Sequence, residues 1–177
     1  MAIKNIFSFV PGYCHYYFDL IGTDDLISEL KKTKDRTLAV LDLITAENEN
    51  FSYQSSKWTT KEVIRHIIDC ERIYSYRAFR FSRFDDTGLS GFKEGMYIEN
   101  SKSSTPILSA LREEYLHVRD SSISLYSNMT EEMLDFKGKV DQNIFSARTL
   151  GFMTIGHNIH HCNFLCQKYL NRKPHTK

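Results

Sequence analysis

The sequence has few prolines and glycines, and it lacks a long apolar run. Its 177 residues include only three prolines and eight glycines, and residues 12–105 contain no proline. So few turn-forming residues argue against an all-β domain, and long proline-free stretches favour helices. A membrane-spanning helix needs roughly 18 consecutive apolar residues, and no such run is present. The sequence therefore predicts an all-α protein without a membrane partner.

The sequence also has no excess of one charge and no secretion signal. Lysine and arginine total 23 against 22 aspartates and glutamates, so the net charge is +1. A nucleic-acid binder usually shows a basic excess or stripe. The apolar patch at residues 6–10 is too short for the core of a signal peptide. We therefore expect a cytoplasmic protein with no nucleic-acid partner.

Cysteines are few, and their context argues against disulfides. Without a secretion signal the thiols should stay reduced, and a free cysteine usually behaves as a small buried apolar residue. The pair at positions 162 and 166 has the wrong spacing for a cysteine-only zinc site. The four residues concerned are Cys14, Cys70, Cys162 and Cys166.

Four long segments show the three- and four-residue apolar spacing of amphipathic helices. After an N-terminal arm (residues 1–23), they span about residues 24–46, 59–84, 105–127 and 146–170. Each begins at a residue suited to the start of a helix: a cap in three cases, and in the third segment a threonine before a proline at the first helical position. These starts are Thr23 or Asp24, Thr59 with Glu62 in a capping box, Thr105 before Pro106, and Ser146.

Four helices in a chain of this length predict one domain, residues 1–177, built as a four-helix bundle. The connection between the second and third helices, residues 85–104, is long enough to cross an end of the bundle. The loop over residues 128–145 holds at most a short turn near residues 130–134.

Three histidines lie where the bundle should be apolar. His157 and His161 are four residues apart, so both project from one face of the last helix. His66 lies at the edge of the inner stripe of the second helix. Buried imidazoles cost desolvation unless something accepts their lone pairs, and three histidines with an open position are typical of catalytic zinc sites. The alternative is that each is hydrogen-bonded within the core, and His160, which lies off the stripe, has a supporting or partly exposed role.

Other side chains near His66 are candidates for supporting roles. Asp69, one turn away, could hydrogen-bond an imidazole or a metal-bound water. Cys70 is either a fourth ligand or a core residue, and we favour the core. Arg77 and Arg80 either form a solvated face or meet an anionic substrate at the mouth of the bundle.

Two segments carry a resemblance to a known family. Residues 57–72, KWTTKEVIRHIIDCER, resemble the second-helix signature of the DinB-like (DNA-damage-inducible) superfamily, and residues 76–83, YRAFRFSR, extend the match. Residues 156–161, GHNIHH, resemble its Gly-His-x-x-His-His motif on the fourth helix. The similarity in order and spacing covers about residues 13–170.

This resemblance implies a bundle with up-down-down-up topology and a divalent metal, zinc or nickel, held by His66, His157 and His161. It also implies a metal-dependent hydrolase or a transferase of low-molecular-weight thiols such as bacillithiol or mycothiol, usually as a homodimer. Cys70 and Asn158 depart from the family pattern, which leaves the substrate open.

Three hypotheses about function follow. The first is an enzyme acting on a small molecule such as a thiol, in which Asp69 orients a ligand and Arg77 places the substrate. The metal would make a nucleophile from water or from a thiol at neutral pH. The second is a non-catalytic, metal-binding stress-response dimer. The third is a metal-free helical protein whose histidines are satisfied internally.

Overall fold

A computed structural model of the protein describes residues 7–101 and 107–171. Its main elements are helices, with one small β-hairpin near the C-terminal third of the chain. The elements are α1 (Gly12–Phe18), α2 (Leu26–Leu41), α3 (Thr60–Phe81), α4 (Glu94–Ser101), α5 (Leu108–Ser127), α6 (Glu131–Asp135), β1 (Lys137–Val140), β2 (Asn143–Ser146), α7 (Ala147–Phe164) and a π-helical turn, η3 (Leu165–Tyr169).

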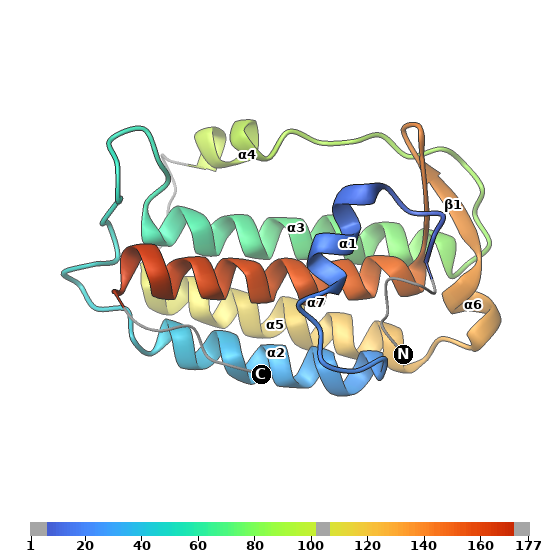
Figure 1. Cartoon of the computed structure of the whole chain (residues 1–177), viewed down its shortest axis with the longest axis horizontal. Helices are drawn as coiled ribbons and strands as arrows, with labels where there is room; N and C mark the ends of the chain where they lie inside the picture. Colours follow the sequence, from blue (N-terminus) through green and yellow to red (C-terminus); the bar gives the residue numbers. More distant parts are fainter. Residues whose placement is uncertain (1–6, 102–106, 172–177) are drawn as a thin grey trace.

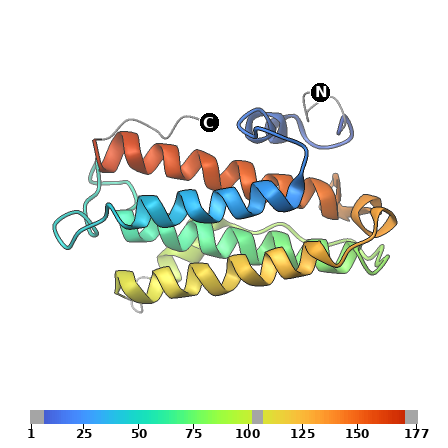
Figure 2. The same ribbon diagram turned by 90° about the horizontal axis from the view of Figure 1, so that it is seen from below.

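Helices α2, α3, α5 and α7 form a four-helix bundle (Figures 1 and 2). Helices α2 and α7 run in one direction, while α3 and α5 run in the other, so the predicted up-down-down-up topology is confirmed. Side-chain pairs with nearly constant sequence separation show that α3 and α5 are parallel. These pairs are Arg65 with Glu114, Glu71 with Arg119, and Ser75 with Ser122.

Because α3 and α5 are parallel, the chain must return the length of the bundle between them. The 22 residues of α3 span about 33 Å at 1.5 Å per residue. The crossover therefore runs along the side of the bundle (Figure 1), rather than across one end as expected. Hydrogen bonds fasten it to the hairpin, since Leu89 N–H donates to Lys139 O at 2.9 Å and Asp141 N–H donates to Leu89 O at 2.8 Å.

The helix starts agree with the predicted caps at two of the four positions. Thr59 and Glu62 form the capping box, and Ser146 accepts from the Thr149 amide at 3.2 Å. At α2 the cap is Asp25, which accepts from the Ser28 amide at 2.9 Å, instead of Thr23 or Asp24. The predicted start at residues 105–106 lies outside the described residues.

Short elements occur where irregular structure was expected. The helix α1 lies in the N-terminal arm, α4 lies in the crossover, and the loop before α7 contains the hairpin. The short helix α6 in that loop agrees with the turn expected near residues 130–134. Helix α2 also ends at Leu41 instead of near residue 46, although Ile44, beyond that end, is still buried. Helix α1 packs across α7 (Figure 1), and Gly156 makes this possible, because a Cβ there would overlap the backbone carbonyl of Tyr17.

We expect Gly156→Ala to destabilise the protein by about 1–3 kcal/mol, the usual cost of overpacking a tight contact. The added methyl group must push α1 away from α7, since the opposing atoms are backbone. Urea unfolding followed by circular dichroism measures the change. Gly95→Ala is the control, because nothing lies within 4 Å of a Cβ there. Equal stability of the two variants would contradict the proposed contact.

The interior contains an ion pair that the sequence did not predict. Arg119 is 0% exposed and Glu71 is 2% exposed, and their bidentate contact has distances of 2.8 Å and 2.9 Å. Arg119 Nη1 also donates to Leu30 O at 3.1 Å and Thr33 Oγ1 at 2.7 Å. One arginine thus joins α5 to α3 and α2 in the core.

Across both described ranges, no helix is long and apolar enough to span a bilayer.

Candidate metal centre

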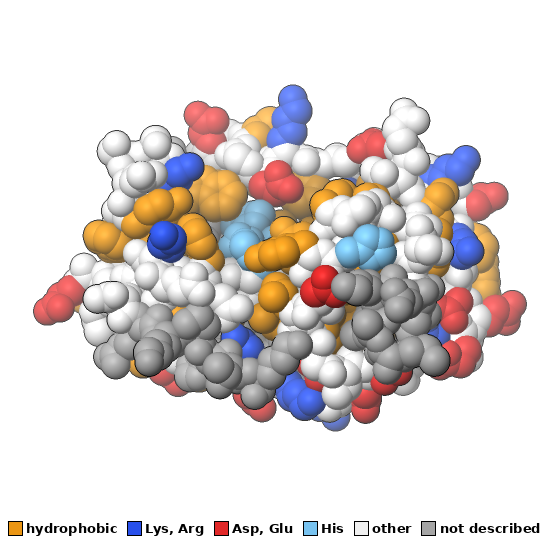
Figure 3. Space-filling model, in the orientation of Figure 1, with side chains coloured by type: hydrophobic (Ala, Val, Ile, Leu, Met, Phe, Trp, Pro, Cys, Tyr) orange, Lys and Arg blue, Asp and Glu red, His pale blue; other side chains and the backbone are white. Residues whose placement is uncertain are grey.

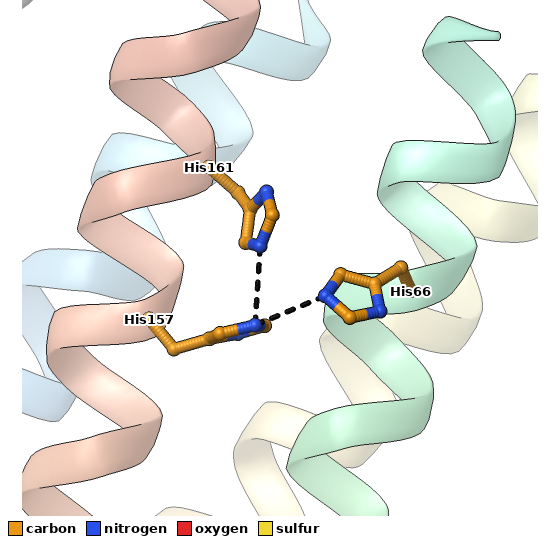
Figure 4. A group of neighbouring side chains, drawn as sticks. All are labelled: His66, His157 and His161. Atoms are coloured by element: carbon orange, nitrogen blue, oxygen red, sulfur yellow. Dashed lines mark hydrogen bonds between the residues drawn. The ribbon is translucent and has the colours of Figure 1, made fainter. Parts of the chain in front are cut away.

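The antiparallel packing of α3 against α7 brings the three predicted histidines together. His157 Nε2 lies 3.1 Å from His66 Nε2 and 3.1 Å from His161 Nε2 (Figure 4). One nitrogen from each ring can be chosen so that all lie within 4.8 Å of one another. His66 and His157 are each only 6% exposed, while His161 is half-buried. The three histidines, although His66 is far from the other two in the sequence, therefore form a single cluster.

Burial keeps all three imidazoles neutral at pH 7. Desolvation, followed by the nearby His160, lowers the pKa of His66 to about 4. Desolvation also lowers the pKa values of His157 and His161 well below their usual range, and the neighbouring histidines lower them further. A neutral imidazole offers a nitrogen lone pair, which is the form that binds a metal ion.

Hydrogen bonding alone does not satisfy this cluster. A ring nitrogen of neutral histidine has either one proton or one lone pair, so His157 Nε2 can form one good hydrogen bond with two neighbours at 3.1 Å. The other contact then either shares the same proton or lone pair, which weakens both bonds, or brings two like groups together. His161 Nδ1 is also buried without a hydrogen-bond partner among the described residues.

The donor set fits a divalent metal ion. Nitrogen ligands bound tetrahedrally to zinc at 2.0–2.1 Å are about 3.3 Å apart, close to the 3.1 Å contacts of His157 Nε2. A cation between the three nitrogens would accept every lone pair and remove the repulsion between like groups.

Aromatic rings surround the cluster. The Trp58 ring centroid lies 4.8 Å from that of His66, and the Tyr17 and Tyr74 centroids lie 5.7 Å and 5.9 Å from that of His157. These residues come from α1, α3 and the loop before α3. All three rings also form part of the wall of an adjoining cavity.

That cavity has a volume of about 540 Å³ and lies between α1, α3, α7, the crossover and the hairpin. Figure 3 shows histidine atoms at the floor of the hollow on this face of the molecule. On the other side of Trp58 and His161 is a shallower groove of about 360 Å³ with the aromatic residues Tyr53, Phe164 and Tyr169 in its walls.

The two other predicted site residues lie in different places. Helical rotation is about 100° per residue, so Arg77 returns to within about 20° of the His66 direction, whereas Asp69 lies roughly 60° away. Arg77 accordingly lines the histidine cavity. Asp69 lies instead in a separate depression beside Met96, where its Oδ1 is 3.8 Å from both Arg65 Nη1 and Arg72 Nη1.

Cys70 and His160 lie beside the cluster without belonging to it. Cys70 Sγ is 3.6 Å from His66 Nδ1 and 3.8 Å from His66 Nε2, so the sulfur lies across the ring. Burial, with Glu94 and Asp69 nearby, raises the pKa of this thiol well above its usual value, and the protonated group packs as core. His160 is half-buried, and its Nδ1 is 2.8 Å from the Tyr16 hydroxyl.

The cavity also contains residues that the sequence did not identify as part of a site. Tyr13 and Tyr17 come from α1, Glu94 from α4 and Asp141 from the hairpin turn. Their elements are fixed by tertiary contacts, so periodicity gave no signal for them. Tyr74 is different, because its place on the inner stripe of α3 could have suggested a cavity position.

Comparison with known proteins identifies the family. A sequence model of the DinB superfamily matches residues 29–169, whereas a search of curated protein sequences gave no match. Solved structures with the same fold include YfiT from Bacillus subtilis, described as a probable metal-dependent hydrolase with an unusual four-helix bundle topology. It is 18% identical with a TM-score of 0.71, and the match covers 81% of this chain and 83% of YfiT.

Two further structures are similar. A mycothiol-dependent maleylpyruvate isomerase is 13% identical with a TM-score of 0.66, and the match covers 82% of this chain and 61% of the isomerase. The DinB-like protein YjoA from Bacillus subtilis is 16% identical with a TM-score of 0.60, and the match covers 86% and 94% of the two chains. At these identities the structural matches establish the fold alone.

Proposed function

This chain belongs to the DinB superfamily, and we propose that it is a metal-dependent enzyme acting on a small molecule. His66, His157 and His161 would hold one divalent ion, zinc or nickel, at the floor of the cavity. The observation that carries this proposal is the meeting of three neutral, desolvated imidazoles whose mutual contacts are not satisfied by hydrogen bonds.

An enzyme site is favoured over a structural metal site. Structural zinc is usually closed by four protein ligands, whereas catalytic zinc keeps one position open. Three histidines form this cluster, and the cavity beside it, about 540 Å³, lies within the usual range for small-molecule sites. When bound, a divalent ion supplies Lewis acidity that makes a nucleophile from water or a thiol at neutral pH.

The protein's own residues have the remaining tasks. Trp58, Tyr17 and Tyr74 limit water around the imidazoles and hold their orientation. Arg77 supplies a positive charge within the same cavity. The position of Asp69 beside Arg65 and Arg72 gives it no contact with the imidazoles, so we assign it no catalytic role in this proposal.

Two reaction classes fit this site: hydrolysis and transfer of a low-molecular-weight thiol. YfiT is described as a probable metal-dependent hydrolase, and the isomerase depends on mycothiol. The classes differ in whether water or a thiol is the nucleophile. A screen of thiol consumption with electrophiles, beside a screen of ester and amide hydrolysis, distinguishes them. The homodimer implied by the family resemblance and the cytoplasmic location expected from the sequence both stay predictions.

We expect one Zn²⁺ or Ni²⁺ ion to bind per chain when metal-free protein is titrated. Because the ligand set exists only in the folded chain, binding should raise the melting temperature, and a thousandfold excess of metal over Kd corresponds to about 4 kcal/mol of stabilisation. Elemental analysis, isothermal titration calorimetry and thermal unfolding provide the measurements. If His66→Ala binds metal as the parent does, the ion lies elsewhere. Failure of the parent to bind either ion would refute the proposal.

A further inference from the structure

Arg77 is a buried arginine without a carboxylate partner. It is 7% exposed, and among the described residues it forms no ion pair, whereas the buried Arg119 has the bidentate partner Glu71. Its one hydrogen bond to a described residue runs from Nη2 to Ser90 O at 2.9 Å. A guanidinium has five N–H donors and stays charged. Most of this donor capacity is therefore left for the cavity that Arg77 lines.

The surroundings position this guanidinium without a direct ion pair to a described residue, although Asp141 is near enough to interact with its charge. The Phe92 ring centroid is 5.4 Å from Arg77 Cζ, in a cation–π contact. The acidic residues that line the same cavity, Glu94 and Asp141, are both exposed to solvent, and Asp141 Oδ1 accepts the Gly91 amide at 3.0 Å. An arginine fixed from one side by a carbonyl and a ring is well placed to bind an anion from the other side.

The distance from Arg77 to the histidines determines the shape of a ligand that reaches both. Arg77 is on the same face of α3 as His66, and a rise of 1.5 Å per residue places it about 16 Å further along the axis. Between these two ends the cavity is bordered by Tyr74 from α3 and by the apolar residues Leu150 and Met153 from α7. The cavity thus has a cationic end and a histidine end, joined by a wall that mixes these side chains with polar ones such as Tyr13 and Asn143.

We propose that the cavity binds an elongated organic carboxylate, with its carboxylate on Arg77, its chain between α3 and α7, and its reacting group at the histidine cluster. The planar carboxylate matches the fork of an arginine, which a neutral group does not. The reacting end of this proposal rests on the proposed metal site, whereas the carboxylate end rests on Arg77 alone.

The test uses thiols of increasing length, each as a carboxylic acid and as the matching alcohol. Zinc-loaded protein is titrated with mercaptoacetate, mercaptooctanoate and mercaptoundecanoate, and with mercaptoethanol, mercaptooctanol and mercaptoundecanol. Calorimetry and the fluorescence of Trp58, the one tryptophan in the chain and part of the cavity wall, report binding. We expect the acid to bind at least tenfold tighter than the alcohol at a longer length. Any preference at the shortest length, where mercaptoacetate can chelate zinc through sulfur and carboxylate, should not depend on Arg77.

Variants assign that preference to one side chain. In Arg77→Gln the preference for the acid should vanish, while Arg77→Lys should retain part of it because the charge remains. Arg80→Gln is the matched control, since Arg80 lies one turn further along α3 and pairs with Asp85. Urea unfolding of each variant shows whether the crossover, held by the Arg77 contact to Ser90, is still in place.

A second set of titrations tests the carboxylate site independently of the metal site. Metal-free protein is titrated with octanoate and octanol, and octanoate should again bind more tightly, in a manner dependent on Arg77. If the thiols fail to bind zinc-loaded protein while this preference persists, the carboxylate site stands and the open metal position fails. If acid and alcohol bind alike at both longer lengths, or if the preference at those lengths survives in Arg77→Gln, the carboxylate site is overturned.

Discussion

Replacing His157 by alanine is expected to abolish stoichiometric metal binding while leaving the bundle folded. His157 contributes the central nitrogen of the cluster, 3.1 Å from the Nε2 atoms of both His66 and His161. Loss of a partner that merely supports a ligand lowers metal affinity by about 10–100-fold, so loss of a ligand itself should exceed about 100-fold. Competition with a chromophoric chelator gives the affinity, and circular dichroism tests the fold.

His160→Ala is the matched control for this experiment. It makes the same substitution on the same helix, but the His160 Nδ1 faces the Tyr16 hydroxyl at 2.8 Å and the ring lies outside the group of candidate ligands. This variant should bind one ion per chain with affinity close to that of the parent. If His160→Ala lost the metal and His157→Ala retained it, the ligand assignment would be wrong.

Replacing Arg119 by methionine should cost about 3–5 kcal/mol of unfolding free energy, the typical penalty for breaking a buried ion pair. The variant leaves the Glu71 carboxylate, 2% exposed, without its bidentate partner, and it also removes the donors to Leu30 O and Thr33 Oγ1. Equilibrium unfolding in guanidinium chloride measures the loss. A variant as stable as the parent would contradict the view that this pair stabilises the packing of α2, α3 and α5.

Two further variants test the origin of that loss. Arg119→Met combined with Glu71→Leu should recover much of the stability, because no buried charge is then left unpaired. Asp120→Ala breaks the contact between Lys34 Nζ and Asp120 Oδ1, in which the aspartate is 56% exposed. Such surface pairs contribute about 0–1 kcal/mol, so that change should be small. An equal loss in Asp120→Ala would point to a general effect of removing charge.

The parts of the fold that could be predicted are those specified by nearby residues. The capping box of Thr59 and Glu62 fixes the start of α3 through contacts within four residues, and Ser146 does the same for α7. Long apolar stripes then define the four bundle helices. The grouping of His157 and His161 also follows from one helical turn, while His66 was a candidate from its place at the edge of the inner stripe and was assigned as a ligand through the family resemblance.

Other features depend on contacts between distant parts of the chain. A helix as short as α1, seven residues long, is marginal by itself in water, and its docking across α7 depends on the space at Gly156. The partnership of Glu71 with Arg119 requires α3 and α5 to be parallel. Asp69 was expected near His66 because the two are close in sequence, yet rotation around α3 directs it toward Arg65 and Arg72.

The crossover between α3 and α5 has a consequence for how this protein can change during evolution. Between α3 and α4 it is irregular chain, and irregular surface chain tolerates insertions and deletions far better than packed helices do. It contributes Gly91, Phe92 and Glu94 to the cavity wall, while the histidines are on α3 and α7. Mutations that lengthen or recompose this segment can therefore alter ligand selectivity without disturbing the bundle that brings the histidines together.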